Sequence, residues 1–291
     1  MKIQHRFLLA GVLAFLPICA AKAQAQPQVG QAKGSDEISA PSSGDEEGTA
    51  KVAKQLANPI ADLVSVPFQS NIDVGLGPNH NGLRYTLNIQ PVIPFKLNDD
   101  WLVISRTVLP FIDQEKVTGT SGGQYGLGDL TQSFFLSPTK PQPGGIIWGV
   151  GPVLFLPTAT DSLLGTEKVG AGPTLVLVKQ TGGLTCGILT NQIWSFAGND
   201  HRRDVDATLV QPFVFFTTKT AFTAGINMES SYDWNADQWT IPINLQFSQV
   251  VKVDGQLMSI GIGGRSYVER PNNGPDWGAR LTVTFLFPVK R

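Results

Sequence analysis

The sequence is poor in the residues that carry cross-links and much of protein chemistry. Its 291 residues include only two cysteines, Cys19 and Cys186, and three histidines, His5, His80 and His201. Two cysteines are too few for a disulfide framework. Histidine is the usual base of a nucleophile–base pair and a common metal ligand, so its scarcity leaves few places for either kind of site.

A surplus of basic residues is also missing. Lys and Arg number 22, and Asp and Glu number 23, which gives a formal net charge of −1. Without a basic surplus the chain is a poor candidate for binding nucleic acid, and we expect no such partner. No apolar run of eighteen residues follows the N-terminal segment, so a helix that spans a membrane is not expected there.

The N-terminus has the composition of a secretory signal peptide. Lys2 and Arg6 precede an apolar run over residues 7–18, and Ala23 and Ala25 have the small-x-small spacing of a cleavage site. The apolar run is too short to form a spanning helix. We therefore expect residues 1–25 to be removed on export.

The next segment, residues 26–58, is polar, acidic and rich in small residues. This composition predicts a disordered leader in the periplasm. Residues 49–57 could form a short helix, capped by Thr49 and ended before Pro59. We interpret the leader as a tether, although the short helix could also lie under the rest of the protein or enter it.

The clearest pattern in the chain is an alternation of apolar and polar residues over 239–248. Apolar residues at odd positions, from Trp239 to Phe247, fall on one face of a strand, and polar residues such as Asn244 fall on the other. About ten residues is the length that a tilted strand needs to cross a bilayer. The segment therefore predicts a strand with one face toward lipid.

Similar segments recur down to the C-terminus, and the connections between them alternate between short turns and longer, polar loops. Short periplasmic turns and longer outer loops are typical of outer-membrane barrels, in which an even strand number leaves both ends in the periplasm. We predict an all-β fold: a transmembrane antiparallel up-and-down β-barrel over residues 59–291. Its twelve strands are expected at 62–73, 83–95, 101–111, 127–137, 146–156, 169–180, 184–196, 205–217, 220–232, 238–250, 256–268 and 277–288.

Aromatic residues favour the same topology. Tyr85, Trp194 and Trp277 fall at the loop ends of predicted strands, and Trp101 and Trp148 fall at the turn ends. Trp and Tyr prefer the two interfaces of a bilayer because their apolar rings carry a polar edge. Aromatic residues at strand ends also occur in soluble sandwiches, which keeps that alternative open.

If the apolar faces meet lipid, the opposite faces line a lumen. Strands 101–111, 146–156 and 184–196 do not alternate cleanly, so the face of Arg106 is the hardest to assign. The interior would carry both signs of charge, which fits either a structural network that fills a narrow lumen or a polar conduit with a charged constriction. The candidate lumen-lining residues are Arg84, Asn88, Gln90, Arg106, Asp129, Asp206, Glu229, Asn244, Arg265 and Arg280.

Patterns of catalysis and metal binding are not found. His80 and His201 fall in predicted outer loops, where no nucleophile–base pair can be proposed. The acidic residues near His201 match the spacing of no established metal loop, and the glycine-rich stretch 119–123 lacks the lysine of a phosphate loop. We name no catalytic residue, no metal ligand and no cofactor, and we do not expect an enzyme.

Several stretches give the chain a family resemblance. They are Ala57–Ala61, Ser65–Gln69, Arg84–Pro94, Gly126–Asp129, Leu156–Asp161, Leu164–Lys168 and Ile193–Gly198. Through them the chain resembles a bacterial family of outer-membrane transporters, often mislabelled neuromedin U and related to proteins grouped under a MetA pathway of phenol degradation. The resemblance implies an outer-membrane barrel and, through the phenol label, small aromatic compounds. It implies no functional residue.

These observations predict a channel in the outer membrane of a Gram-negative bacterium, for the passive passage of small molecules, aromatic compounds among them. The expected partners are outer-membrane lipid, the insertion machinery that would recognise the alternating strand 279–287, and small-molecule solutes. The oligomeric state is left open. The first alternative is a closed structural or ligand-binding barrel that acts through its outer loops, and the second is a barrel enzyme.

Overall fold

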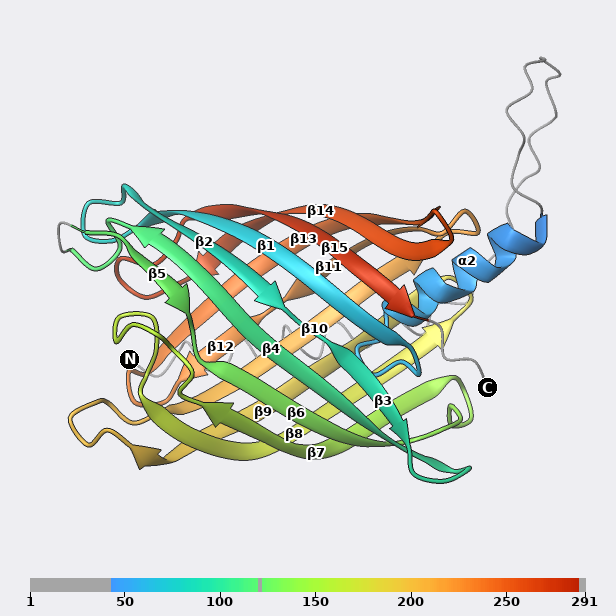
Figure 1. The fold of residues 1–291 in the computed structure, drawn as a ribbon, viewed down its shortest axis with the longest axis horizontal. Coiled ribbons are helices and arrows are strands. Elements are labelled where there is room, and N and C mark those ends of the chain that lie inside the picture. The colour runs from blue at the N-terminus through green and yellow to red at the C-terminus, as the bar shows by residue number, and fades with distance from the viewer. Residues whose placement is uncertain (1–42, 120–121, 288–291) are drawn as a thin grey trace, which may run out of the picture.

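The structure, a computed structural model, describes residues 43–119 and 122–287, with side chains from residue 47 onward. The predicted signal peptide, 1–25, and the first part of the predicted leader, 26–42, lie outside the described residues. Figure 1 shows a barrel wall of long tilted strands, with one helix, α2 (Ser43–Leu56), at one end.

The strand segments form a single antiparallel sheet that closes on itself, because β1 pairs with β15. Three pairs of segments run in line as interrupted strands: β2 with β3, β5 with β6, and β11 with β12. The wall is therefore a closed barrel of twelve strands, and the predicted fold class is confirmed. The segments are β1 (Val64–Leu76), β2 (Gly82–Ile89), β3 (Val92–Lys96), β4 (Trp101–Glu115), β5 (Gln124–Leu127), β6 (Leu130–Pro138), β7 (Ile146–Leu156), β8 (Lys168–Thr181), β9 (Leu184–Gly198), β10 (Asp206–Thr217), β11 (Phe222–Met228), β12 (Ser230–Asp233), β13 (Gln238–Val253), β14 (Gln256–Glu269) and β15 (Trp277–Phe287).

The two ends of the barrel differ in their connections. One end, called the short-turn end, carries the turns 97–100, 139–145, 182–183, 218–221 and 254–255. The other, called the long-loop end, carries the connections 77–81, 116–119 with 122–123, 157–167, 199–205, 234–237 and 270–276. The turn at Asp254 and Gly255 is tight because both residues have positive φ, 48° and 86°. This is the backbone of the two-residue hairpin turns that match the twist of antiparallel strands.

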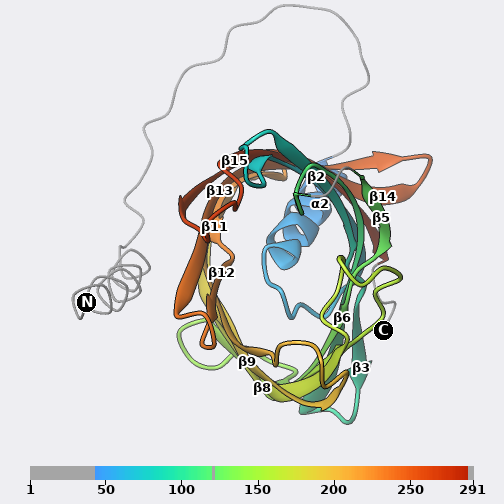
Figure 2. The same ribbon diagram turned by 90° about the vertical axis from the view of Figure 1, so that its left-hand side faces the viewer.

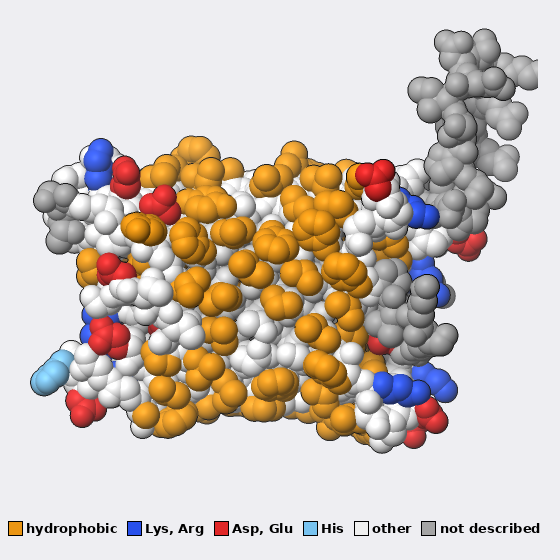
Figure 3. Space-filling model, in the orientation of Figure 1, with side chains coloured by type: hydrophobic (Ala, Val, Ile, Leu, Met, Phe, Trp, Pro, Cys, Tyr) orange, Lys and Arg blue, Asp and Glu red, His pale blue; other side chains and the backbone are white. Residues whose placement is uncertain are grey.

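An apolar band encircles the outside of the barrel. Large hydrophobic side chains such as Ile262, Leu281 and Leu175 are exposed on the outward face of the strands. Figure 3 shows hydrophobic side chains across the middle of the visible face, with charged side chains gathered at the two ends. The alternation seen in the sequence thus places apolar residues on the outside of much of the barrel.

The helix α2 enters the barrel at the short-turn end, and Figure 2 shows it within the ring of strands. The sequence predicted a helix over 49–57, whereas α2 begins earlier, at Ser43, and ends at Leu56. Residues 57–63 then link α2 to β1; we call residues 43–63 the internal segment. In the described part of the chain, no helix combines the length and apolar character that a membrane-spanning helix needs.

Candidate functional site: a divided lumen

The centre of the lumen holds a network of buried charges around Glu229. This residue lies at the interruption between β11 and β12. Arg280 on β15 donates from Nη1 and Nη2 to the two carboxylate oxygens of Glu229, each at 2.8 Å, and Arg265 on β14 donates from Nη2 at 2.9 Å. Paired geometry of this kind is among the stronger hydrogen-bonded arrangements in proteins, and it fixes both side chains.

Asp73 on β1 provides the second carboxylate of this network. It lies 3.4 Å from Nη1 of Arg265 and accepts a hydrogen bond of 3.0 Å from the Tyr267 hydroxyl. Nε of Arg265 donates to Asn244 on β13 at 3.0 Å, and its guanidinium carbon lies 5.5 Å from the centre of the Tyr267 ring. We call Arg265, Arg280, Glu229 and Asp73 the charged network.

Two further arginines face the lumen without such pairing. Arg84 stands opposite Asp73 in the register and donates from Nε to Gln114 at 2.8 Å, and Arg106 donates from Nη2 to Gln90 at 3.2 Å. Among the described residues, neither guanidinium has a carboxylate oxygen within 4.0 Å. With Arg265 and Arg280 these are four cations beside two carboxylates, so this part of the lumen has a formal charge of about +2.

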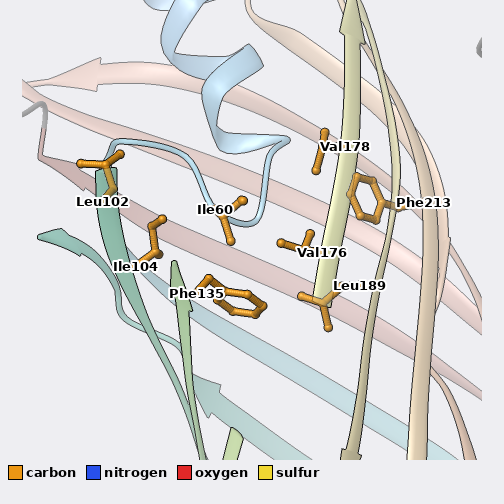
Figure 4. Close-up of a cluster of buried hydrophobic side chains, with 8 residues drawn as sticks. All are labelled: Ile60, Leu102, Ile104, Phe135, Val176, Val178, Leu189 and Phe213. Atoms are coloured by element: carbon orange, nitrogen blue, oxygen red, sulfur yellow. The ribbon is translucent and has the colours of Figure 1, made fainter. Parts of the chain in front are cut away.

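The opposite side of the lumen is apolar, which the sequence did not predict. A buried cluster gathers lumen-facing side chains from β4, β6, β8, β9 and β10, and Figure 4 shows them converging on one side chain of the internal segment, Ile60. We call these wall residues the apolar wall: Leu102, Ile104, Phe135, Val176, Val178, Leu189 and Phe213.

Ile60 fits the apolar wall because β7 leaves room for it. A Cβ placed on Gly149 would lie 3.1 Å from Cδ1 of Ile60 and 3.1 Å from Cβ of Phe135. The backbone before Ile60 is also fixed, since its amide donates to Oδ1 of Asn58 at 3.1 Å. Full burial of an isoleucine side chain contributes about 1.5–3 kcal/mol, so this contact anchors the linker in the lumen.

The helix α2 packs against the barrel wall at the short-turn end. Ala53 packs in a buried cluster with Val250 on β13 and Leu286 on β15, and Leu56 packs against the same cluster. Gln180 at the end of β8 donates from Nε2 to the carbonyl of Lys54 at 2.9 Å. That bond satisfies one of the carbonyls that the last turn of a helix leaves without an internal partner.

Two cavities separate the internal segment from the arginines. The larger, about 180 Å³, lies between Leu56 and the lumen-facing side chains of Arg280 and Thr284. The smaller, about 130 Å³, is bordered by the linker and by Gln90 and Arg106. Both cavities adjoin Leu56, Pro67 and Gln90, so the end of α2 lies over polar and cationic side chains as well as apolar ones.

Hydrogen bonds join two loops at the long-loop end. Arg202 donates from Nη2 to the carbonyls of Ser162 and Gly165 at 2.7 and 2.5 Å, which joins the loops 199–205 and 157–167. Nζ of Lys168 lies 2.8 Å from Asp204, and its hydrogen bond and charge hold the pKa of the Asp204 carboxyl below its usual range. The two loops therefore form one connected unit over β8, β9 and β10.

The ten predicted lumen residues fall into four groups, of which Asp129 and Asp206 each form one alone. Glu229, Asn244, Arg265 and Arg280 meet in or beside the charged network, and Gln90, Arg106, Arg84 and Asn88 face the lumen next to it, Asn88 opposite Gln69. Asp129 instead accepts hydrogen bonds from the amide and hydroxyl of Thr166, at 2.6 and 2.8 Å, and so holds the loop 157–167.

Asp206 is placed differently from its prediction. It stands opposite Trp194, whose side chain is exposed on the outer face, and it accepts a hydrogen bond of 2.7 Å from Gln192. The reason is that β10 turns its apolar residues Leu209 and Phe213 inward, onto the apolar wall. A rule that sends polar residues inward fails for a strand whose inner face is apolar.

Sequence reasoning missed Asp73, Gln114 and Ile60. Asp73 alternates with Gln69 and Asn71, so the polar face of its strand carried a usable signal. Ile60 gave no such signal, because one isoleucine after Asn58 and Pro59 does not distinguish a buried anchor from a flexible tether. Within the described residues no three of His, Cys, Asp and Glu are gathered as a metal site would need.

Comparisons with known proteins bear on this architecture. No protein-family model matches the sequence, and no curated protein matches it. The COG4313 outer membrane channel from Pseudomonas putida F1 has a similar structure, with a TM-score of 0.60 at 16% identity over 77% of this chain and 94% of that chain. The beta domain of the Bordetella autotransporter Brka has a TM-score of 0.46 at 9% identity, covering 78% of this chain and 100% of its own. Outer membrane phospholipase A from Escherichia coli has a TM-score of 0.46 at 10% identity, over 81% of this chain and 98% of that chain.

The first of these likenesses shows the fold that the chain shares with an outer-membrane barrel, and the other two are too distant to add to it. The resemblance to the transporter family stays a prediction, since no family model matches.

Proposed function

We propose that this protein is an outer-membrane channel for the passive passage of small molecules, with the internal segment as a plug. One observation carries the proposal: an apolar band on the outside surrounds a lumen that carries polar and charged side chains. Lipid favours that outer surface, and water and polar solutes favour that interior. The wall alone would separate a polar route from the membrane.

The position of the protein in a cell follows from the same proposal. Residues 1–25 act as a cleaved signal peptide, 26–58 as a leader that includes α2, and 59–291 as the barrel. The partners are outer-membrane lipid, the insertion machinery and solutes. Aromatic compounds are the solutes that the family resemblance favours, and we include them in the proposal on that ground alone.

The contacts of the internal segment with the barrel wall support its role as a plug. Ile60 lies on the apolar wall, Ala53 and Leu56 pack at the short-turn end, and Gln180 holds the carbonyl of Lys54. Ile60 thus occupies the lumen beside β4 to β10, and α2 occupies its short-turn end beside β13 and β15. Removal of the segment would widen the passage without altering a strand.

A closed barrel that binds a ligand through its loops is the second candidate. The junction of loops 157–167 and 199–205 through Arg202 favours it, because connected loops can form a fixed binding surface. We do not propose an enzyme; hydrolysis of lipid by the pure protein would contradict this.

Conductance in a planar bilayer tests the proposal. The chain without its signal peptide is compared with a form that also lacks residues 26–60, and so lacks both α2 and Ile60. A channel with a plug predicts low or intermittent conductance in the first and at least a severalfold larger conductance in the second. Equal, steady conductance in both forms would keep the channel and reject the plug. Silence in both forms would reject the channel and favour the closed barrel.

A further inference from the structure

We propose that the lumen has a binding site for small organic anions with an apolar body, in which Arg106 holds the anionic group and the apolar wall holds the body. The inference deepens the proposed channel function, on which it rests for the access of solutes to the lumen. It is carried by the position of one arginine at the border between the two halves of the lumen.

Arg106 has N–H donors that make no hydrogen bond to a described side chain. Its one hydrogen bond to a described side chain runs from Nη2 to Gln90 at 3.2 Å, whereas Arg265 and Arg280 each make several bonds within the charged network. A guanidinium carries five N–H donors in a planar fork, which suits the two oxygens of a carboxylate. A carboxylate at Arg106 would also reduce the surplus of positive charge in this part of the lumen.

The apolar wall begins directly beside this cation. Ile104 and Arg106 lie on the same face of β4, about 7 Å apart along the strand. Across the ladder, Phe135 stands opposite Ile104, and Val92 stands opposite Arg106. Val92 both packs against the buried cluster and borders the same cavity as Arg106. A ligand at Arg106 therefore meets a cation on one side and hydrocarbon on the other.

The space available determines the shape of the ligand. The cavity at Arg106 is about 130 Å³, which corresponds to about four water molecules. It has room for a head group but not for a long body as well. The body would take the place of Ile60 against Leu102 and Phe135, so ligand and plug compete for one surface. An inorganic anion would leave that surface unused.

Equilibrium binding to the full chain in detergent tests the site. Hexanoate is the probe, acetate has the same head without the body, and hexanamide has the same body without the charge. We expect saturable hexanoate binding at least tenfold tighter than that of acetate, because each buried methylene contributes about a fourfold factor. Hexanamide should bind at least tenfold more weakly than hexanoate.

Variants locate the site. Arg106→Gln should weaken hexanoate binding at least tenfold, whereas Arg84→Gln, a lumen arginine that bonds Gln114 instead, should change it less than twofold. Ile60→Ala should strengthen binding, because it weakens the competitor; this variant keeps the test open if Arg106→Gln does not fold. Oleate supplied in the micelles checks for a lipid source. Tighter binding of oleate than of hexanoate, lost in Arg106→Gln, would support the site and assign its ligand to the membrane.

Several results would overturn the inference. They are equal affinity for hexanoate and acetate, an equal loss in Arg84→Gln and Arg106→Gln, or unchanged binding in both Arg106→Gln and Ile60→Ala. Binding and conductance fail separately. If the protein conducts but does not bind hexanoate, the channel proposal stands and the binding site is rejected. If the protein does not conduct but binds hexanoate through Arg106, the binding site stands and the channel proposal is rejected.

Discussion

At the residue scale, Glu229 is the acceptor that makes two buried arginines tolerable. The side chains of Arg280 and Arg265 are 3% and 8% exposed, and both donate to this carboxylate. A buried ion pair adds little net stability over a well-packed apolar group, but removal of one partner leaves a charge without compensation. Glu229 is therefore the member of the charged network whose loss should matter most.

Glu229→Gln should lower the free energy of unfolding by about 3–5 kcal/mol, the range found when a buried ion pair is broken. Urea unfolding of the refolded protein in detergent, followed by tryptophan fluorescence, would measure it. Glu115→Gln, an exposed position on β4, is the control and should be near neutral. Equal unfolding midpoints for the two variants would contradict this role of Glu229.

Asp204 gives a prediction about pH. A carboxyl whose pKa is lower in the folded chain than its usual value of about 3.9 stabilises the folded state above that value. The contribution is lost as pH falls through the folded pKa. Since Lys168 is the main cause, Lys168→Met should bring the pKa of Asp204 back toward its usual value.

A carbon-13 NMR titration of the aspartate carboxyls would measure this pKa. Lys219→Met, a lysine in the turn 218–221 at the other end of the barrel, is the control and should leave the titration of Asp204 unchanged. Identical titration curves in the protein with and without Lys168 would show that the ion pair does not form in solution.

At the scale of elements, the internal segment depends on a small number of contacts. Ile60 is its anchor on the apolar wall, and Gly149 provides the space. An aspartate at position 60 would place an unpaired charge against hydrocarbon, which is strongly unfavourable.

Ile60→Asp should therefore release the linker and raise single-channel conductance severalfold, while the strands remain folded. Ile60→Val keeps an apolar side chain and costs about 0.5–1.5 kcal/mol, so its conductance should stay close to that of the unaltered protein. The same conductance in Ile60→Asp and Ile60→Val would rule out Ile60 as an anchor.

The apolar wall also explains what could and could not be read from the sequence. Alternation located the twelve strands because most of the barrel has lipid on one side and polar groups on the other. Strands 101–111, 146–156 and 184–196 did not alternate cleanly because they carry or adjoin the apolar wall. Their two faces are both apolar, so periodicity gives no orientation. The error at Asp206 has a related cause, because the inner face of β10 is apolar as well.

At the scale of the whole molecule, the outer apolar band sets the depth of the barrel in a membrane. Ile262, near the middle of β14, and Val268, near its long-loop end, are both exposed, at 63% and 60%. Since they share a strand and a face, they differ mainly in depth.

Ile262→Arg should destabilise the barrel in lipid by about 2–4 kcal/mol, and Val268→Arg by about 0–1 kcal/mol, because the cost of a cation on the lipid face falls toward the interface. Reversible unfolding in liposomes would measure both. An equal cost at the two positions would mean that the band is not centred on the membrane as proposed.

The short linker between α2 and β1 has a kinetic consequence. Only residues 57–63 separate the helix from the barrel wall, so the helix cannot diffuse away once it leaves its seat. A short tether gives an effective concentration in the millimolar range. If the detached segment bound with a dissociation constant of about 10 μM, the tethered form would favour occupancy by about a hundredfold. A weak contact can thus keep the lumen occupied for most of the time and still allow frequent, brief departures.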